Sequence, residues 1–435
     1  MIGSLFNSMK VKDLRDRILF VLFGLFVFVL TIHIHVPGIN SEVWHKLLER
    51  GSLFQFLNMF TGGALNKFSI CAMGITPYIN ASIIMQLLTV VIPKLHELQK
   101  EVGEIGRQKI SQYIRFLTVA LALLQSTMMV VSLSKYVGES GERIFAISGI
   151  PYFLTVIVTL TAGTCFLMWL GEQMSDKGIG NGVSLIIFAG IVLRYPDYIY
   201  NTFKVGQLQG APYLVKILLF LIVSVGLIMA IIILSQGQRK IPVQYAKRVV
   251  GRRVFGGQSS FIPIRVNNAG VISIIFAISI LYLPTTLVGF FGKDHIGFMS
   301  KIGAFINSIF SPTHWFYNLS YALLVIFFTY FYSYITFNIV DVSDNLKKYG
   351  GFIPGIRPGR PTAEFLERVL SRVTFIAAIF LAFIAVAPTY AMQMTGVTTF
   401  YLGSTSLLII VGVALDTMQQ IEARLVMRHY QGFMK

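Results

Sequence analysis

The stretch ILLFLIVSVGLIMAIIILSQGQ, Ile217–Gln238, contains no Asp, Glu, Lys or Arg. A transmembrane helix needs about 20 predominantly apolar residues, and a central charged residue costs roughly 2.5–3.5 kcal/mol on the insertion scale. Membrane β-strands instead alternate apolar and polar residues over about ten positions. Because the apolar residues here are continuous, we expect this stretch to cross a bilayer as an α-helix, whose backbone hydrogen bonds are satisfied internally.

Stretches of the same kind recur along the whole chain. Of the 435 residues, 55% are hydrophobic and 13% are charged, whereas charged residues make up roughly a quarter of a globular sequence. The uncharged stretch Val373–Leu415 is long enough for two spans, with a break expected near Pro388 and Gly396. Within the stretch Ile302–Val340, the span itself is expected at Trp315–Ile339. The sequence therefore predicts an all-α integral membrane protein with about ten spans. The other uncharged stretches are Ile18–Val36, Phe68–Ile92, Phe116–Ser134, Ile144–Leu170, Gly178–Leu193, Val266–Gly292, Ile302–Val340 and Val373–Leu415.

The distribution of basic residues predicts the orientation in the membrane. The termini and the alternate loops 93–115, 171–177, 239–265 and 341–372 together carry 26 Lys and Arg, and the opposite side carries 10. Cytoplasmic loops are enriched in Lys and Arg, so both termini are expected in the cytoplasm. The net charge of +17 then lies mainly at the inner membrane surface. We expect contact with anionic lipids there and no direct DNA binding.

A short apolar stripe follows the first predicted span. Residues 53–60 are too few to cross a bilayer and end at Gly62–Gly63, so this segment is expected to be re-entrant or to lie at the interface. The next helix is expected to be interrupted by Pro77 and carries Asn80 and Gln86. Polar side chains in a span indicate either helix–helix hydrogen bonds or an aqueous cavity, and the residues alone leave both open.

The loop RKIPVQYAKRVVGRRVFGGQSSFIPIR, Arg239–Arg265, has seven basic residues and no acidic ones. Its Gly pairs and prolines suit a hairpin-like excursion from the membrane. Such a basic loop could simply enforce topology or touch anionic lipid. Its length and its alternation of Ile, Val and Tyr with basic residues also suit the docking of an acidic partner.

Enzymatic motifs are absent from the sequence. We find no P-loop, HExxH, GxSxG or metal-spaced Cys/His cluster, so we expect no catalytic residues, metal or cofactor. Cys71 and Cys165 lie in apolar runs and are read as packing residues. Glu172 and Asp416, near helix ends, are read as interfacial. Few charges within the spans favour a passive conduit or an assembly scaffold over a secondary transporter, which would need a midplane binding site.

Several strings resemble the SecY family, the central channel subunit of the bacterial Sec protein translocase. In order they extend over nearly the whole chain, and the resemblance is closest to bacterial members. This resemblance implies a protein-conducting channel that translocates unfolded preproteins and releases hydrophobic segments laterally into the membrane. The matching segments are GITPYINASIIMQLL (Gly74–Leu88), KGIGNGVSLIIFAGI (Lys177–Ile191), RKIPVQYAKRVVG (Arg239–Gly251), GGQSSFIPIRVNNAGVI (Gly256–Ile272), FNIVDVSDNLKKYGGFIPGIRPGRPT (Phe337–Thr362) and STSLLIIVGVALDTM (Ser404–Met418).

The resemblance also implies an architecture. It predicts two inverted, pseudo-symmetric halves, residues 1–200 with helices 1–5 and residues 201–435 with helices 6–10, around a central hourglass pore. A plug segment at 53–67 would close the outer funnel. Its implied residues are Phe54, Leu57, Phe60, Gly62 and Gly63. The implied ring of aliphatic side chains at the pore constriction is Ile79, Ile83, Val183, Ile187, Ile275 and Ile409.

Partners and further sites follow from the same resemblance. It implies a polar cluster at a lateral gate for signal sequences, made of Asn80, Gln86 and Asn181. It implies SecE and SecG as small membrane subunits, and the SecA ATPase and the ribosome as docking partners in the bacterial inner membrane. The implied docking residues are Arg239, Lys240, Lys247, Arg248, Arg252, Arg253, Lys347, Lys348, Arg357 and Arg360.

The sequence departs from the family pattern at three positions. Ser273 stands where the family usually has proline, Asn268 where it commonly has methionine, and Val183 where it usually has isoleucine. The first departure could alter the bend of the seventh helix and thereby the place of Ile275. The third slightly widens the implied constriction and keeps its apolar character.

Overall fold

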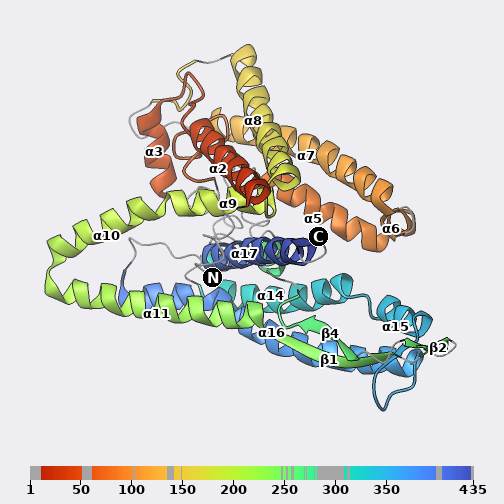
Figure 1. Ribbon diagram of the computed structural model, residues 1–435. Coiled ribbons are helices and arrows are strands. Elements are labelled where there is room, and N and C mark those ends of the chain that lie inside the picture. The colour runs from red at the N-terminus through yellow and green to blue at the C-terminus, as the bar shows by residue number, and fades with distance from the viewer. Residues whose placement is uncertain are drawn as a thin grey trace. The chain divides into compact units, whose positions relative to one another are not determined.

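The computed structural model describes residues 11–50, 61–100, 103–134, 142–147, 149–245, 248–250, 253–255, 259–268, 270, 272–278, 280–281, 308–310, 314–397 and 404–432. These residues fall into two compact units, and Figure 1 shows that both are built mainly from helices. The first unit holds the described residues up to Val205 and from Val413 onward, and the second holds those between Gly206 and Gly412.

The first unit is entirely helical apart from turns and isolated bridges in the described residues. Its helix α9 (Gly182–Leu193) has only 12 residues, and α10 (Tyr195–Gln209) begins two residues after its end. The last helix, α17 (Ser404–Gly432), begins in the second unit and ends in the first. Helix α10 crosses the unit boundary between Val205 and Gly206. The other helices are α2 (Lys12–Ile32), α3 (Ser41–Arg50), α5 (Thr76–Val91), α6 (Pro93–Lys100), α7 (Gly103–Ser134) and α8 (Ile150–Lys177).

The second unit combines long helices with a small sheet. Strand β1 pairs antiparallel with β4, and Pro242 lies opposite Phe261, so the predicted hairpin-like excursion is confirmed. Strand β5 extends this sheet beside β1, and β2 pairs with β3. The elements are α11 (Ala211–Gln236), β1 (Gln238–Tyr245), β2 (Arg248–Val250), β3 (Arg253–Phe255), β4 (Ser259–Arg265), α14 (Trp315–Thr336), α15 (Ile339–Lys348), β5 (Gly351–Phe352) and α16 (Arg360–Thr395).

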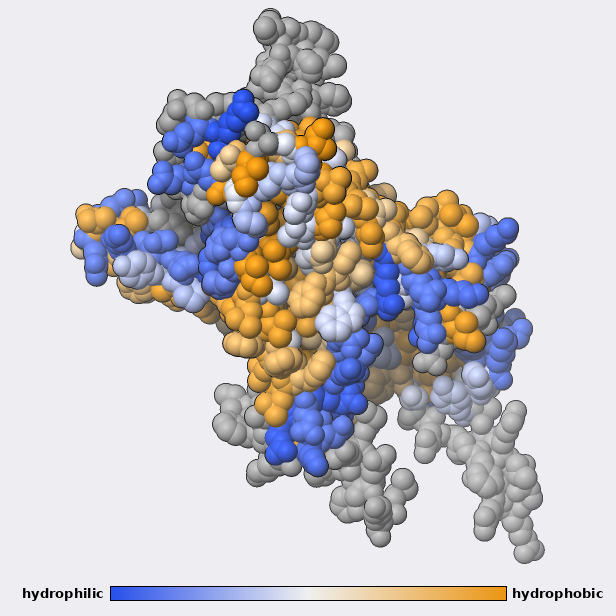
Figure 2. Space-filling view, turned by 90° about the horizontal axis from the view of Figure 1, so that it is seen from above, coloured by the Kyte–Doolittle hydropathy of each residue, from blue (hydrophilic) through white to orange (hydrophobic). Residues whose placement is uncertain are grey.

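Seven helical segments in the described residues are long and apolar enough to cross a membrane. Helices α2, α5 and the helical residues 272–278 occupy three further predicted spans, so the structure agrees with about ten. Figure 2 shows hydrophobic residues covering much of the face drawn. On α11, the apolar side chains of Leu218, Ile222 and Ile233 are 61%, 58% and 69% exposed, as expected of a helix whose solvent is lipid. The seven segments are Ile105–Ser134, Ile150–Lys177, Gly182–Gln209, Ala211–Gln236, Trp315–Lys348, Arg360–Thr395 and Ser406–Val426.

Two expectations about proline were wrong. Pro77 does not interrupt a helix, because residues 61–75 form turns and α5 begins only at Thr76 with Pro77 in its first turn, where no backbone donor is missed. Pro388 does not break α16, which continues to Thr395. Neighbouring groups in a membrane protein can satisfy the carbonyl that a proline frees. The expected break at Gly396 is confirmed: this glycine ends α16 in the left-handed conformation.

The turn segment 61–75 is held by a buried cluster in the first unit. Trp44 of α3, 1% exposed, donates its indole N–H to the Leu65 carbonyl at 2.7 Å. Its ring meets Phe68 edge-on with centroids 5.0 Å apart. The cluster continues onto α8 through Val156 and Leu160. This segment is therefore anchored as a defined part of the unit, although most of it is not helical.

The hairpin of the second unit shares a core with the helices beside it. Ile241 and Val243 of β1 and Ile264 of β4 pack in one cluster with Leu366 and Leu370 of α16. Leu346 of α15 and Ile353 belong to the same cluster. The basic hairpin is therefore part of a packed assembly and not a loose loop.

Candidate constriction and docking surface

The first unit carries four of the six predicted ring residues on two helices. Ile79 and Ile83 are half-buried on α5 and, being four residues apart, lie on one face of it. Val183 and Ile187 have the same spacing on α9, where Val183 is half-buried and Ile187 is 5% exposed. Helix α8 packs against both α5 and α9. One scaffold helix thus contacts both of these ring-bearing helices.

The start of α9 is fixed by polar groups and by close packing. The Asn181 side chain accepts a hydrogen bond from the Ser184 N–H at 3.2 Å and caps the helix. The Gly182 N–H donates to the Ser175 hydroxyl at 2.8 Å. A Cβ on Gly182 would overlap the Gly171 carbonyl of α8, so the backbones approach where only glycine fits.

The other two predicted ring residues belong to the second unit. Ile275 is half-buried in the helical residues 272–278, and Ile409 of α17 is 2% exposed. Ser273, which stands in place of the usual proline, is buried and donates its hydroxyl hydrogen to the Gly270 carbonyl at 3.3 Å. The helix therefore keeps both its backbone donor and a satisfied hydroxyl at this position. The convergence of all six side chains on one axis stays a prediction.

The polar residues assigned to a lateral gate differ in their surroundings. Asn80 is half-buried on α5. The Oε1 atom of Gln86 is buried and has no hydrogen-bond partner among the described residues. Asn181 is exposed and already serves as the cap of α9. Gln86 is thus the one of these three amides with a buried acceptor left unused in the described part of the chain.

The predicted plug lies only partly in the described residues. Phe54, Leu57 and Phe60 fall outside them. Gly62 and Gly63 have φ angles of +66° and +87°, a conformation that favours glycine. A Cβ on Gly62 would lie 3.0 Å from the Cα of Gly190, so this end of the segment rests directly against α9.

Sequence reasoning missed that contact with α9, since nothing in the spacing of two distant glycines indicates that they touch.

Strands β1, β4 and β5, helix α15 and the start of α16 are called the hairpin assembly below, since β1, β4 and the two helices share one core. Several predicted docking residues are exposed on this assembly. Arg239 and Lys240 are exposed on β1, and the Lys240 ammonium lies 4.8 Å from the centre of the Phe261 ring. Lys347 and Lys348 are exposed in the last turn of α15, where cations complement the helix dipole.

Arg357 is exposed on a loop whose backbone is held by side-chain hydrogen bonds. Gly355 and Gly359 flank it with positive φ angles of +82° and +100°. The Thr362 hydroxyl donates to the Arg357 carbonyl at 2.8 Å, and the Ser343 hydroxyl donates to the Gly359 carbonyl at 2.9 Å. The loop is thereby stiff, and it exposes a guanidinium suited to a bidentate contact with a carboxylate.

The structure says less about the remaining predicted docking residues. Arg360 is exposed and pairs with Glu364 one turn along α16, its Nε 3.1 Å from the carboxylate oxygen. Such an exposed pair contributes little stability. Arg248 and Arg253 lie on β2 and β3, whose side chains are not described, and Lys247 and Arg252 lie outside the described residues.

An ion pair between α7 and α8 was not predicted. The Arg115 Nε lies 2.8 Å from the Glu172 carboxylate, and the two side chains are 51% and 18% exposed. The sequence did indicate that such a pair was possible, because Arg115 and Glu172 each lie next to the end of a predicted span, on the same side of the membrane. The charge of Glu172 is therefore balanced by that of Arg115.

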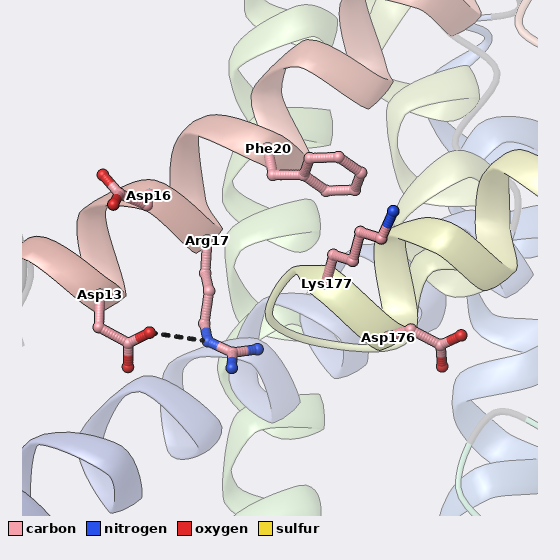
Figure 3. Close-up of a pocket in the computed structure, with 6 residues that line it drawn as sticks. All are labelled: Asp13, Asp16, Arg17, Phe20, Asp176 and Lys177. Atoms are coloured by element: carbon pink, nitrogen blue, oxygen red, sulfur yellow. Dashed lines mark ion pairs between the residues drawn. The ribbon is translucent and has the colours of Figure 1, made fainter.

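A shallow pocket of about 350 Å³ lies where α2 meets the end of α8. Figure 3 shows Asp13 and Arg17 of α2 as an ion pair, 3.5 Å between Nε and Oδ1, with Phe20 facing Lys177. The Lys177 ammonium is 5.9 Å from the centre of the Phe20 ring. Asp16 and Asp176 complete the lining. The pocket is charged and open, unlike the mostly apolar clefts that bury small molecules.

Comparison with solved structures defines the class of protein. The fold resembles a structure of a protein-conducting channel with a TM-score of 0.61 and 17% identity, covering 95% of this chain and 93% of that one. It also resembles the Sec61 chain in the canine ribosome–channel complex from the endoplasmic reticulum, with a TM-score of 0.57 and 16% identity, covering 95% and 93%. The molecule is thus a multi-pass α-helical membrane protein with the fold of protein-conducting channels.

Sequence comparison then defines the family. The SecY family model matches residues 69–418. The protein translocase subunit SecY of Halalkalibacterium halodurans is 45% identical over 445 residues, covering the whole of both chains. This chain belongs to the SecY family.

Proposed function

We propose that this chain is the channel through which unfolded preproteins cross a bacterial inner membrane, with both termini in the cytoplasm. The observation that carries the proposal is its full-length similarity to protein translocase subunits SecY. The alternative of a secondary transporter is not favoured, because the similar folds are protein-conducting channels. The channel itself performs no catalysis in this proposal, and its energy comes from a partner.

The two units support the proposed architecture. The proposed halves are residues 1–200 and 201–435 around an hourglass pore; the boundary at Val205 and Gly206 supports this division, whereas the residues from Val413 onward group with the first unit. The ring residues Ile79, Ile83, Val183, Ile187, Ile275 and Ile409 would form its constriction, and the segment 53–67 would be its plug. An apolar constriction stops ions by excluding water, yet it yields to a threading chain of any sequence. Asn80, Gln86 and Asn181 would face signal sequences at a lateral gate.

The proposed partners follow from the exposed basic surface. The hairpin assembly presents Arg239, Lys240, Lys347, Lys348 and Arg357, which would dock the ribosome or SecA. A channel of this fold is found in a complex with the ribosome in the canine structure. SecE and SecG would complete the membrane complex, and anionic lipids would contact its inner surface.

The first prediction concerns transport. In vesicles reconstituted with this chain, the companion subunits, SecA and ATP, a preprotein should become protected from added protease. Arg357→Glu should lower the protected fraction at least several-fold, since it reverses a charge suited to carboxylate contact. Arg368→Glu is the matched control, because Arg368 is also exposed, on α16, but lies outside the predicted docking residues. Absence of protection with every component active would reject the proposed function.

The second prediction concerns the seal. Replacing Val183 and Ile187 with glycine removes apolar bulk from one face of α9 and should raise ion conductance through the resting channel severalfold. The same change at Val192 and Leu193, which are each 37% exposed on the same helix, should leave conductance unchanged. Conductance in planar bilayers is the measurement, and equal leak in both pairs would exclude α9 from the constriction.

A further inference from the structure

The connection between α8 and α9, residues 178–181, is held from two other helices. We call it the α8–α9 tip. Ile179 is 2% exposed and forms a core cluster with Leu14 of α2 and Ile421 of α17. Val11, Ile18 and Leu425 pack around this cluster. All of these residues belong to the first unit.

Two hydrogen bonds reinforce the apolar contact. The Gly180 N–H donates to the Gln420 Oε1 of α17 at 3.0 Å. The Arg17 guanidinium of α2 donates to the Gly178 carbonyl at 3.4 Å, from the position that Figure 3 shows beside the end of α8. Gly180 has a φ of +86°, and a Cβ there would lie 3.1 Å from the Thr417 hydroxyl oxygen of α17. The backbone of the tip thus lies against the α17 surface.

The tip leads directly into the helix that carries two ring residues. Asn181 caps α9, Gly182 begins it, and Val183 follows at once. The tip is joined to α9 with no intervening residue, and the close backbone contact of Gly182 with Gly171 holds the start of α9 against α8. Displacement of the tip would therefore move Val183 and Ile187 together, because a hydrogen-bonded helix moves as a rigid body.

We propose that residues 417–425 of α17 act as a clamp on the α8–α9 tip, and that Gln420 and Ile421 are positioning residues for the constriction on α9. The proposal rests on the proposed function only in naming that constriction. The clamp itself is a physical contact that can be tested separately. It would let a partner that displaces the end of α17 loosen the seal from outside the pore.

The first test changes the hydrogen-bond acceptor. Gln420→Leu removes the acceptor for the Gly180 N–H, whereas Gln420→Glu keeps a carboxylate oxygen there. We expect several-fold higher resting conductance for Gln420→Leu in the reconstituted complex, and near-normal conductance for Gln420→Glu. Gln419→Leu alters an exposed neighbour on the same helix and should change nothing. Unchanged conductance for Gln420→Leu, or an equal leak for Gln420→Glu, overturns the role of this bond.

The second test changes the apolar contact and reads out the tip directly. Ile421→Ala removes a side chain that is 6% exposed, and Val426→Ala removes one that is 57% exposed on the same helix. Trypsin should cut after the exposed Lys177 several-fold faster in Ile421→Ala than in Val426→Ala, and conductance should rise with it. Equal cleavage rates at equal protein levels in the membrane would show that no clamp exists.

The glycine variants of Val183 and Ile187 separate this proposal from the proposed function. If they leak and the clamp variants do not, the clamp is rejected and the channel function stands. If the clamp variants speed cleavage after Lys177 while the ring variants do not leak, the clamp is upheld and the assigned seal fails.

Discussion

Gly163→Ala is expected to destabilise the protein severely, although it adds only one methyl group. A Cβ at Gly163 of α8 would overlap the carbonyl oxygen of Ile70 and lie 2.7 Å from its carbonyl carbon. Both atoms are backbone and cannot move aside by changing a rotamer. The turn segment 61–75 would have to leave α8, and overpacking of this kind costs about 1–3 kcal/mol or more. We expect a lower melting temperature in detergent and less protein in the membrane.

The matched control for Gly163→Ala lies on α11. A Cβ at Gly226 would meet nothing within 4 Å, so Gly226→Ala should leave the melting temperature unchanged or slightly raise it. In water, alanine stabilises a helix interior by about 1 kcal/mol relative to glycine, which also predicts an unchanged or higher melting temperature for Gly226→Ala. Equal melting temperatures for the two alanine variants would show that the α8 contact with Ile70 is not tight.

Like Gly163→Ala, Trp44→Ala is expected to lower the stability of the protein strongly. It removes a 1%-exposed side chain, an edge-on contact with Phe68 and the donor to the Leu65 carbonyl. Removal of a buried Trp side chain costs about 3–5 kcal/mol. Trp44→Phe keeps much of the packing but leaves that carbonyl without this donor, a loss of about 1–3 kcal/mol.

Trp169 provides the comparison for Trp44, because it is 53% exposed on α8. Trp169→Ala should change the melting temperature much less than Trp44→Ala, with Trp44→Phe in between. The measurement is the melting temperature of each variant in the purified complex in detergent. A Trp169→Ala loss as large as that of Trp44→Ala would mean that burial does not govern stability here.

The sequence predicted the spans well because lipid imposes a strict composition on them. Trp315–Ile339 was expected as a span, and α14 covers Trp315–Thr336. A break was also expected near Gly396, and this glycine ends α16 in the left-handed conformation that favours glycine. Pro388 was misread, since the cost of a proline inside a helix depends on neighbouring groups that a single segment does not reveal.

The parts of the site that the sequence did not predict all depend on contacts between distant segments. Nothing along the chain indicates that Gly62 touches Gly190, or that Gln420 accepts a hydrogen bond from Gly180. The pairing of Arg115 with Glu172 could have been suggested from their shared side of the membrane, but not its 2.8 Å geometry. The ring residues are ordinary aliphatics in isolation, and only the family resemblance singled them out.

The shared core of the hairpin and α16 has a mechanical consequence. Leu366 and Leu370, near the start of α16, are packed under the strands through Ile241 and Ile264. Helix α16 has 36 residues and so extends for about 54 Å as a nearly unbroken rod. A load applied to the basic strands would be delivered to one end of that rod, which would then act as a lever rather than letting the strands bend alone.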